Sequence, residues 1–396
     1  MRRPSYDDLG VSAHKPDVRA AIADVSPGLF PGAFCKAVPD ILAGSSEHCL
    51  VMHSDGAGTK SALAWLHYLR HGEERVFSDI AQDSLVMNLD DLICVGASGP
   101  FLLSNTIGRN SKLVTGAIVK AIIMGYEGLA QRLSPYGVDI VTCGGETADV
   151  GDIVRTVIVD STITTRMLRS GFINCHMVAP GHEIVGLASF GKAAYEDKPN
   201  SGIGTNGFTA LRHGVLSASY KYTAPETYAP EIAGLAYQGR FDIDDPLPGE
   251  ACTVGEAFLS PTRTYAPVVI ELLRQVRSGI SAMFHNSGGG QTKCLGFGEG
   301  VRYEKDNMFQ IPPVFRFIQE TTGAALREML TTFNMGHLLE VVCDPAASAE
   351  IIAITKGFGI DARVVGRVER KAEGRSLVVT MDDETLEFDA DAIGSP

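Results

Sequence analysis

The chain has 396 residues, of which 45% are apolar and 20% charged, and its formal net charge is −13. This length exceeds what one hydrophobic core usually holds, so we expect two globular domains, and the lack of an apolar run of about 18 residues argues against a membrane protein. The acidic balance, without clusters of Lys and Arg, argues against a nucleic-acid groove, so an anionic substrate has to be met by backbone amides, single basic side chains or a metal ion.

The cysteines and the N-terminus indicate the cellular compartment. Eight cysteines are scattered singly, without a CxxC pair, and several lie inside apolar runs. This pattern favours buried free thiols in a reducing environment, with a catalytic cysteine as the minor alternative. The opening residues, MRRPSYDDLGVS, contain no apolar signal region. We therefore predict a cytoplasmic protein.

Strand and helix signals alternate in the first half of the chain, which indicates an α/β or α+β architecture. Ser78 is a suitable N-cap for one of the helices, and Gly96 is a suitable stop for it. In chain order, the pattern predicts a strand at 48–53, helices at 59–72, 78–96 and 112–133, a strand at 138–143, and one or two strands at 152–167.

A stretch containing Gly and Pro at 165–182 marks a domain boundary. Beyond it, the pattern predicts strands at 183–189, 336–342 and 361–368 and helices at about 206–217, 264–277, 312–332 and 345–357. Residues 218–262 are rich in Pro, Gly and Tyr without clear periodicity and are interpreted as an insertion. From Glu369 onward there are eight acids and three bases, which predicts a solvated tail. The predicted units are therefore 1–172, 173–370 and an acidic tail at 371–396.

The stretch HSDGAGTK at 53–60 carries an aspartate, a threonine and a lysine just after an apolar run. Taken alone, an Asp-Gly pair after a strand indicates a turn. Three further stretches also place glycines beside carboxylates or small polar residues: DDLICVGASGP at 90–100, CGGETADVGD at 143–152 and HNSGGGQTK at 285–293. Glycines let backbone N–H groups approach phosphates, and carboxylates bind Mg²⁺. Four such stretches in one acidic chain favour a site for a nucleotide and Mg²⁺.

The stretch GIGTNG at 202–207 matches the dinucleotide pattern GxGxxG but lacks its context. The nearest predicted strand ends 13 residues earlier, and the acid that would hold a ribose is missing at the expected spacing. These features argue against an NAD site. The same residues suit a helix N-terminus, where Thr205 or Asn206 caps the helix and free N–H groups hold an anion.

The order of motifs along nearly the whole chain resembles the aminoimidazole ribonucleotide synthetase (phosphoribosylformylglycinamidine cyclo-ligase) family. The motifs are YDDLGV (6–11), SDGAGTK (54–60), DIAQDSLVMNLDDLICVGA (79–97), CGGETADVGD (143–152), GLASFG (186–191), SGIGTNGFTALRH (201–213), LSPTRTYAPVVIELL (259–273), FHNSGGG (284–290), PPVFRFIQE (312–320) and TTFNMG (331–336). The resemblance implies an N-terminal α/β domain with a mixed sheet, which dimerises through its strands, and a C-terminal α+β domain.

The resemblance also implies a reaction. ATP phosphorylates the formyl oxygen of formylglycinamidine ribonucleotide, the ribosyl-bearing nitrogen attacks the formyl carbon, phosphate leaves and the imidazole ring closes. The expected cofactors are ATP and Mg²⁺, and the expected partners are a small phosphoribosyl amidine substrate and a second copy of the chain, without nucleic acid or membrane. In such a reaction the protein mainly positions groups and stabilises charge.

Residue by residue, the resemblance implies Mg²⁺ ligands at Asp55, Asp91 and Glu146, with Asp152 as a weaker fourth. It implies an ATP pocket lined by Gly56, Gly58, Thr59, Lys60, Gly144 and Gly145, in which Lys60 pairs with phosphate charge. It implies a substrate side at Thr205, Asn206, Ser287, Gly288, Gly289 and Gly290. The expected catalytic residues are Asp55, Lys60, Asp91 and His285, and a packed loop histidine is the alternative for His285.

The chain departs from the family pattern in three places. Gly204 stands where the family usually has a histidine two residues before the asparagine, Pro100 is displaced by one residue, and the 218–262 insertion and the acidic tail are extra. Gly204 keeps open a phosphoryl transfer to another small acceptor within the same superfamily. A non-catalytic dimeric nucleotide-binding protein is a further alternative, and an NAD oxidoreductase is the most distant one.

Overall fold

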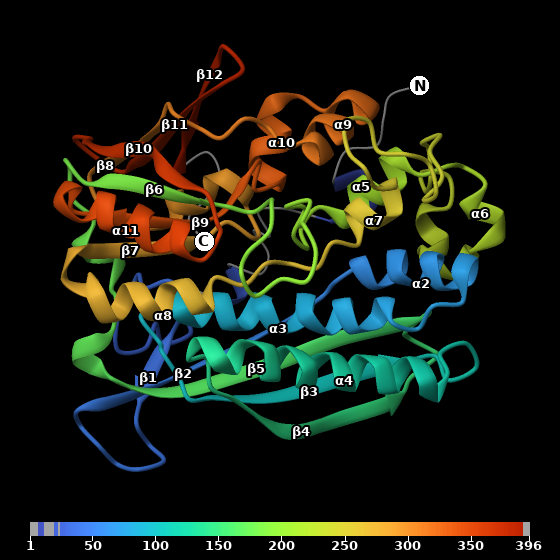
Figure 1. Cartoon of the computed structure of the whole chain (residues 1–396), viewed down its shortest axis with the longest axis horizontal. Helices are drawn as coiled ribbons and strands as arrows, with labels where there is room; N and C mark the ends of the chain where they lie inside the picture. The colour runs from blue at the N-terminus through green and yellow to red at the C-terminus, as the bar shows by residue number, and fades with distance from the viewer. Residues whose placement is uncertain (1–6, 12–19, 23, 391–396) are drawn as a thin grey trace.

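The computed structural model of the chain describes residues 7–11, 20–22 and 24–390. Its strands form two mixed β-sheets, one from the first half of the chain and one from the second, and most helices pack between or beside them (Figure 1). This arrangement confirms the predicted two-domain α/β (α+β) fold. No helix in the described part of the chain is both long and apolar enough to cross a bilayer.

The first sheet has the strand order β1-β2-β5-β3-β4. Its strands are β1 (Ala37–Pro39), β2 (His48–Gly56), β5 (Val157–Leu168), β3 (Phe101–Arg109) and β4 (Ile140–Asp149). Only the β3–β4 pair is parallel. Alternate apolar residues such as Val51, Leu103 and Ile163 are buried on the face that the helices cover, which fixes the register of the sheet.

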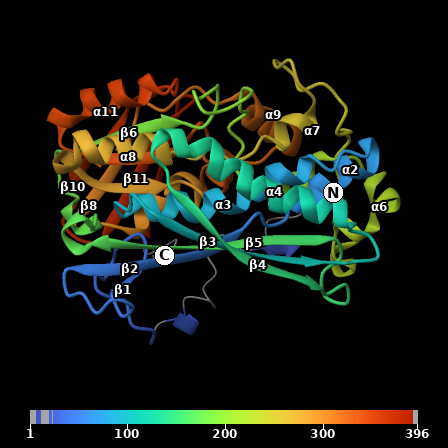
Figure 2. The ribbon, with the colours of Figure 1, turned by 60° about the horizontal axis from the view of Figure 1, so that its bottom comes forward.

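Helix α3 (Val76–Cys94) occupies the centre of the molecule. It contacts β2 and β5 on one side and β7 and α8 of the second half on the other, and all its residues except Ser78 and Asp79 are buried. Helices α2 (Lys60–His71) and α4 (Gly116–Leu133) flank it on the same face of the first sheet (Figures 1 and 2). Polar side chains of α3 are therefore buried where the two halves of the chain meet.

The second sheet has the order β12-β11-β8-β10-β6-β9-β7. Its strands are β6 (Glu183–Ala188), β7 (Ile280–His285), β8 (Val301–Lys305), β9 (His337–Cys343), β10 (Ala362–Arg370), β11 (Arg375–Met381) and β12 (Glu384–Asp389). Its helices are α5 (Phe208–Val215), α6 (Tyr220–Thr223), α7 (Val254–Phe258), α8 (Ala266–Gln275), α9 (Pro313–Thr322), α10 (Leu326–Thr332) and α11 (Pro345–Gly357).

Several predicted boundaries in the first half were wrong. Helix α3 begins at Val76, so Ser78 is not its N-cap, and the Ser78 hydroxyl instead donates to the Ala121 carbonyl of α4 at 3.0 Å. The strand predicted at 138–143 continues through the GGE motif to Asp149. Strand β3 was missed altogether, because its sequence, FLLSNTIGR, mixes apolar residues with loop-forming Ser, Asn and Gly.

The second half also required corrections. Gly323, with φ +63°, divides the helix predicted at 312–332 into α9 and α10. The acidic segment from 375 to 389 is not a solvated tail, because it forms β11 and β12 of the second sheet. Strand β11 has no acidic residue and is largely buried, whereas the acids lie in the turn after it and in β12, so the net charge of the segment hid two strands.

A charged cluster is buried in the second sheet. The ammonium group of Lys305 donates to a carboxylate oxygen of Glu340 and to the Gln291 carbonyl at 2.9 Å, and His337 Nε2 lies 2.7 Å from the same Glu340 oxygen. Burial alone would raise the pKa of Glu340, but Lys305 and the hydrogen bond with His337 outweigh it and lower the pKa to about 2. The cluster therefore favours the ionised carboxylate in the folded state.

This cluster predicts a stability loss in acid. A carboxyl whose pKa is depressed by folding stabilises the native state above its unfolded pKa, and this contribution is lost as the pH falls from about 4.5 toward about 2. We expect urea unfolding of the parent protein to lose more stability over this range than unfolding of Glu340→Gln, even though the variant is less stable at neutral pH. Equal losses in the two proteins would contradict the assignment.

Candidate active site

Asp91, near the end of α3, joins side chains from both halves of the chain. One carboxylate oxygen lies 2.8 Å from Nδ1 of His285, the last residue of β7, and the other lies 3.3 Å from Nε2 of His53 on β2. Burial alone would raise the pKa of Asp91, but the hydrogen bond with His285, together with His53, outweighs it and lowers the pKa. Both carboxylate oxygens of Asp91 are therefore occupied by imidazole groups.

His285 is fully buried, at 0% exposure, and its second ring nitrogen, Nε2, has no hydrogen-bond partner among the described residues. A buried polar atom without a partner costs free energy unless a ligand or water satisfies it. Because Asp91 holds Nδ1, the free nitrogen has a fixed direction. The chemistry of this pair is that of a carboxylate-oriented imidazole, which can accept or deliver a proton.

The glycine loops of the predicted substrate side lie next to each other. A Cβ atom added to Gly288 would come within 4.0 Å of the Asn206 side chain, and one added to Gly290 would lie only 2.5 Å from the Phe333 carbonyl. Gly289 and Gly290 have φ of +91° and +50°. This loop directly follows His285, so the structure brings the SGGG stretch, Asn206 and the imidazole into one region, with Ser287 buried within it. Thr205 is bonded elsewhere, to the Thr262 hydroxyl at 2.6 Å.

Lys60 is not free to pair with phosphate in this structure. Its ammonium group donates to Asp83 at 2.9 Å, to the Gly204 carbonyl at 3.1 Å and to the Ser260 carbonyl at 2.6 Å, and its side chain is fully buried. Three acceptors use all three N–H groups. Lys60 thus ties α2 to α3 and to two segments of the second half, and a role in phosphate binding would require these bonds to break.

The end of β2 carries Asp55, which is exposed and accepts a hydrogen bond from the Gly56 N–H group at 2.7 Å. The carboxylate of Asp160 on β5 lies over Gly56, so close that a Cβ there would meet it at 1.7 Å. Burial, and next the charge of Asp55, raise the pKa of Asp160. This end of the sheet therefore holds two neighbouring carboxylates. Thr59, after Gly58 in the following turn, contacts the Thr209 hydroxyl at 2.9 Å.

The four predicted metal ligands do not converge. Gly144, Gly145 and Glu146 lie inside β4, which is separated from β2 by β5 and β3, and Asp152 lies in a loop beside an open hollow. Within the described ranges, no three His, Cys, Asp or Glu side chains are grouped closely enough to bind one metal ion. A metal role for Asp91, Glu146 or Asp152 stays a prediction, as does an ATP role for the β4 glycines.

Two family models match most of the chain. A model of the AIR synthase related protein, N-terminal domain, matches residues 36–167, and a model of the AIR synthase related protein, C-terminal domain, matches residues 179–379. The chain belongs to the AIR synthase related protein family. The resemblance predicted from the order of the motifs is thereby confirmed.

The chain is also similar to two named proteins and to one solved structure. A phosphoribosylformylglycinamidine cyclo-ligase of Methanococcus maripaludis strain C5 is 27% identical, over 93% of each chain. A chloroplastic/mitochondrial phosphoribosylformylglycinamidine cyclo-ligase of Vigna unguiculata is 29% identical, over 88% of this chain and 77% of that one. The structure of T. maritima PurL complexed with ADP has a TM-score of 0.55 at 12% identity; the match covers 97% of this chain but only 49% of that one. This last likeness concerns the fold alone.

The family motifs did not reveal three residues of the site. His53 opens the motif HSDGAGTK, but its partners Asn88 and Asp91 lie 35 and 38 residues away in the sequence. Asp83 lies within the apolar pattern of a predicted helix. An acid at an apolar position, without a visible partner, was the only sign that it belongs to a site. Asp160 occupies a partly exposed position of an alternating strand, which gives no local signal of a site.

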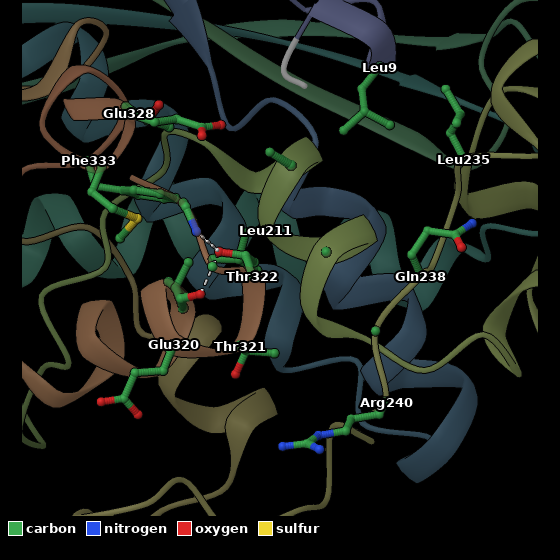
Figure 3. Close-up of a pocket in the computed structure, with 18 of the residues that line it drawn as sticks. Leu9, Leu211, Leu235, Gln238, Arg240, Glu320, Thr321, Thr322, Glu328 and Phe333 are labelled. Atoms are coloured by element: carbon green, nitrogen blue, oxygen red, sulfur yellow. Dashed lines mark hydrogen bonds between the residues drawn. The ribbon is translucent and has the colours of Figure 1, made fainter. Parts of the chain in front are cut away.

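One cavity lies away from these side chains. It has a volume of about 740 Å³ and is enclosed by α5, α9, α10 and the 234–240 segment of the insertion (Figure 3). Figure 3 shows Leu211, Leu235 and Phe333 around it together with Glu320 and Glu328. None of the predicted site residues lines this cavity. Thr332 and Phe333 line this cavity and also lie against Gly207, so they link it to the glycine loops.

Proposed function

We propose that the chain is an ATP-dependent phosphoribosylformylglycinamidine cyclo-ligase that forms aminoimidazole ribonucleotide in purine biosynthesis, in the cytoplasm. The observation that carries the proposal is the Asp91–His285 pair: a fully buried imidazole with an unpartnered nitrogen, directly before a glycine loop. Family membership and the names of the similar proteins support the same activity.

In the proposed reaction, the formyl oxygen of formylglycinamidine ribonucleotide attacks the γ-phosphorus of ATP and ADP leaves. The ribosyl-bearing nitrogen then attacks the formyl carbon, inorganic phosphate leaves with the former formyl oxygen, and the ring closes with loss of a proton. His285 accepts this proton at Nε2, while Asp91 stabilises the imidazolium that forms. The backbone N–H groups of the loop from Ser287 to Gly290 hold the substrate phosphate.

Asp55 and Asp160 lie one position apart on neighbouring strands and are the carboxylates that we assign to Mg²⁺. Two adjacent carboxylates are hard oxygen ligands, and the raised pKa of Asp160 reflects burial and a like charge that a divalent cation would neutralise. Bound there, Mg²⁺ would neutralise the charge of the ATP phosphates. The chain's own contribution is to hold Asp160 over Gly56, where only a glycine leaves room for the carboxylate.

The cofactor requirement tests the proposal. ADP release should depend on both formylglycinamidine ribonucleotide and a divalent cation. Equal ATP turnover in EDTA would contradict the metal assignment. Turnover with another small acceptor, but none with formylglycinamidine ribonucleotide, would favour a different phosphoryl transfer. Gly204 motivates this alternative, because it supplies no side chain at that position.

Asp55→Asn removes one negative charge while keeping the size and turn preference of the side chain. We expect turnover to fall roughly a hundredfold, because one strong electrostatic contact in the transition state is weakened. The melting temperature without ligand should stay close to that of the parent, whereas the thermal shift produced by Mg-ATP should shrink. A folded variant with normal turnover and a full Mg-ATP shift would show that Asp55 only shapes a turn.

We also propose that the chain is a homodimer that pairs through the open face of the first sheet. Met52, Leu102 and Val141 lie in one cross-strand row with Thr164 and are 62%, 44% and 46% exposed. Ile158 and Leu168 extend the same face. In Figure 1 the described helices lie on the other side of this sheet. A contiguous exposed apolar face of this kind supports a closed two-fold interface.

The dimer proposal predicts the effect of a charge in this row. We expect the parent protein to be a dimer at micromolar concentration by light scattering and Leu102→Glu to be largely monomeric. Leu69→Glu serves as the matched control, because Leu69 is similarly exposed, at 48%, but lies on α2. A monomeric parent protein, or a fully dimeric Leu102→Glu variant, would contradict the proposed interface.

A further inference from the structure

We propose that Gln291 and Asn334 are positioning residues for the substrate phosphate. They fix the glycine loop (287–290) relative to the loop before α5 (202–206), which we call the α5 loop. The phosphate part of this inference rests on the proposed cyclo-ligase activity. The structural part rests on a chain of buried hydrogen bonds that begins at Lys305 and ends at the α5 loop.

Gln291 directly follows the glycine loop and is fully buried, at 0% exposure. The ammonium group of Lys305 lies 3.0 Å from its amide oxygen and 2.9 Å from its backbone carbonyl oxygen. An ammonium group only donates hydrogen bonds, so the amide oxygen of Gln291 has to face Lys305. The amide nitrogen consequently faces the backbone carbonyls of Asn334 and His337 and donates to both. Lys305 thus sets the orientation of the Gln291 amide.

Asn334, in the turn between α10 and β9, continues this chain of bonds and is also buried. Its amide nitrogen donates to the Gly202 carbonyl at 2.8 Å. Its amide oxygen accepts hydrogen bonds from the Ser189 hydroxyl and the Gly336 N–H group, both at 2.9 Å. Gly202 begins the α5 loop, and Asn206 ends it. One network of buried amides therefore joins the glycine loop to the α5 loop.

The two loops meet where a phosphate can be held. A Cβ atom added to Gly288 would come within 4.0 Å of the Asn206 side chain. The N–H groups of Gly288 and Gly289 make no hydrogen bond to any residue that the structure describes, so both can donate to an anion. A displacement of about 1 Å is enough to misalign such donors. Gln291 and Asn334 therefore act on the phosphate through the loops that they hold together.

The first test uses full-length Gln291→Met, which keeps the length of the side chain and removes its amide. We expect KM for formylglycinamidine ribonucleotide to rise about tenfold or more, with KM for ATP within about twofold of the parent value. Gln82→Met is the matched control, because Gln82 is also buried and its amide donates to the Thr262 carbonyl of the second half, at 2.9 Å. This control should lose stability and keep both KM values.

A second variant cuts the network at its other end. Asn334→Asp keeps the acceptor oxygen and replaces the amide donor to Gly202 by another acceptor. It should raise KM for formylglycinamidine ribonucleotide as Gln291→Met does. Asn307→Asp is its control, because the Asn307 amide also donates to one carbonyl, that of Val364 at 2.7 Å, but is exposed. Its KM values should match those of the parent protein.

A third readout is independent of turnover. Hydrogen–deuterium exchange followed by mass spectrometry should show faster exchange in Gln291→Met at the glycine loop and also at the α5 loop, which lies about 85 residues away in the sequence. A role confined to local packing would change the first segment only.

The outcomes separate this proposal from the proposed function. If the parent forms no aminoimidazole ribonucleotide, the proposed function fails and the exchange readout alone decides. Parental KM for formylglycinamidine ribonucleotide in a folded Gln291→Met protein, or parental exchange of its α5 loop, would overturn the proposal. If this variant does not fold, Asn334→Asp decides by the same measurements, with the glycine loop as the distant segment.

Discussion

Replacing Lys60 by methionine is expected to lower the free energy of unfolding by about 3–5 kcal/mol, the usual cost of removing one partner of a buried ion pair. The carboxylate of Asp83 would then be buried without its counter-charge, although Thr262 would still donate to it at 2.6 and 2.8 Å. The Gly204 and Ser260 carbonyls would lose their shared donor as well. Because these groups belong to different segments, the loss should loosen the contact between the two domains.

Denaturant unfolding measures this effect, and two variants control for it. Lys120→Met, at an exposed position of α4, should leave stability within about 0.5 kcal/mol of the parent. Adding Asp83→Asn to Lys60→Met should recover part of the loss, because asparagine removes the uncompensated charge and keeps an oxygen acceptor for Thr262. If Lys60→Met were as stable as the parent protein, the interdomain role of Lys60 would be refuted, and its availability to phosphate would have to be reconsidered.

Replacing His285 by asparagine is expected to lower kcat by about 10²- to 10⁴-fold, the range over which a positioned general base contributes to catalysis. Asparagine retains an N–H donor for Asp91 but removes the nitrogen that corresponds to Nε2. The fold should therefore persist, and the melting temperature and the Mg-ATP thermal shift should stay close to those of the parent. Steady-state kinetics with formylglycinamidine ribonucleotide measure the change.

His182→Asn is the control for this substitution, because His182 lies at intermediate exposure in the turn before β6 and its ring bonds only to the Ala179 N–H group, at 3.3 Å. Its kinetics should match those of the parent protein. A His285→Asn protein with normal kcat would show that His285 only packs within the fold. This is the alternative that the sequence left open for it.

The sequence predicted the fold chiefly through the order of its motifs. The helices corresponding to α2, α3 and α11 were located from apolar periodicity and glycine stops, with errors of a few residues at their ends. Strand β4 was cut short because Gly144 and Gly145 signal a loop locally, whereas the strand continues past a break in register at Gly144 and pairs with β3 again from Gly145. Strands β11 and β12 were missed because the net charge of the whole segment was given more weight than the apolar run LVV inside it. In each case tertiary pairing overrode a local preference.

The site was predicted less completely, and the reason is distance along the chain. Asp91 and His285 are 194 residues apart, so no local pattern joins them, although each was singled out within its own motif. For Lys60 the local pattern was misleading. A lysine after a glycine loop indicates a phosphate ligand, but in the structure its ammonium group donates to three buried acceptors. The contacts of His53 could not be predicted from the sequence. They depend on the orientation of the Asn88 amide, which is set by three carbonyl groups from different elements.

The central claim is that the formyl oxygen is phosphorylated before the ring closes. The most direct measurement is a turnover of formylglycinamidine ribonucleotide carrying ¹⁸O in its formyl group, in the presence of ATP and Mg²⁺, with mass analysis of both products. The proposed mechanism predicts aminoimidazole ribonucleotide without the label and inorganic phosphate that contains one ¹⁸O atom per molecule. Aminoimidazole ribonucleotide accompanied by unlabelled phosphate, or hydrolysis of ATP without any ring-closed product, would contradict it.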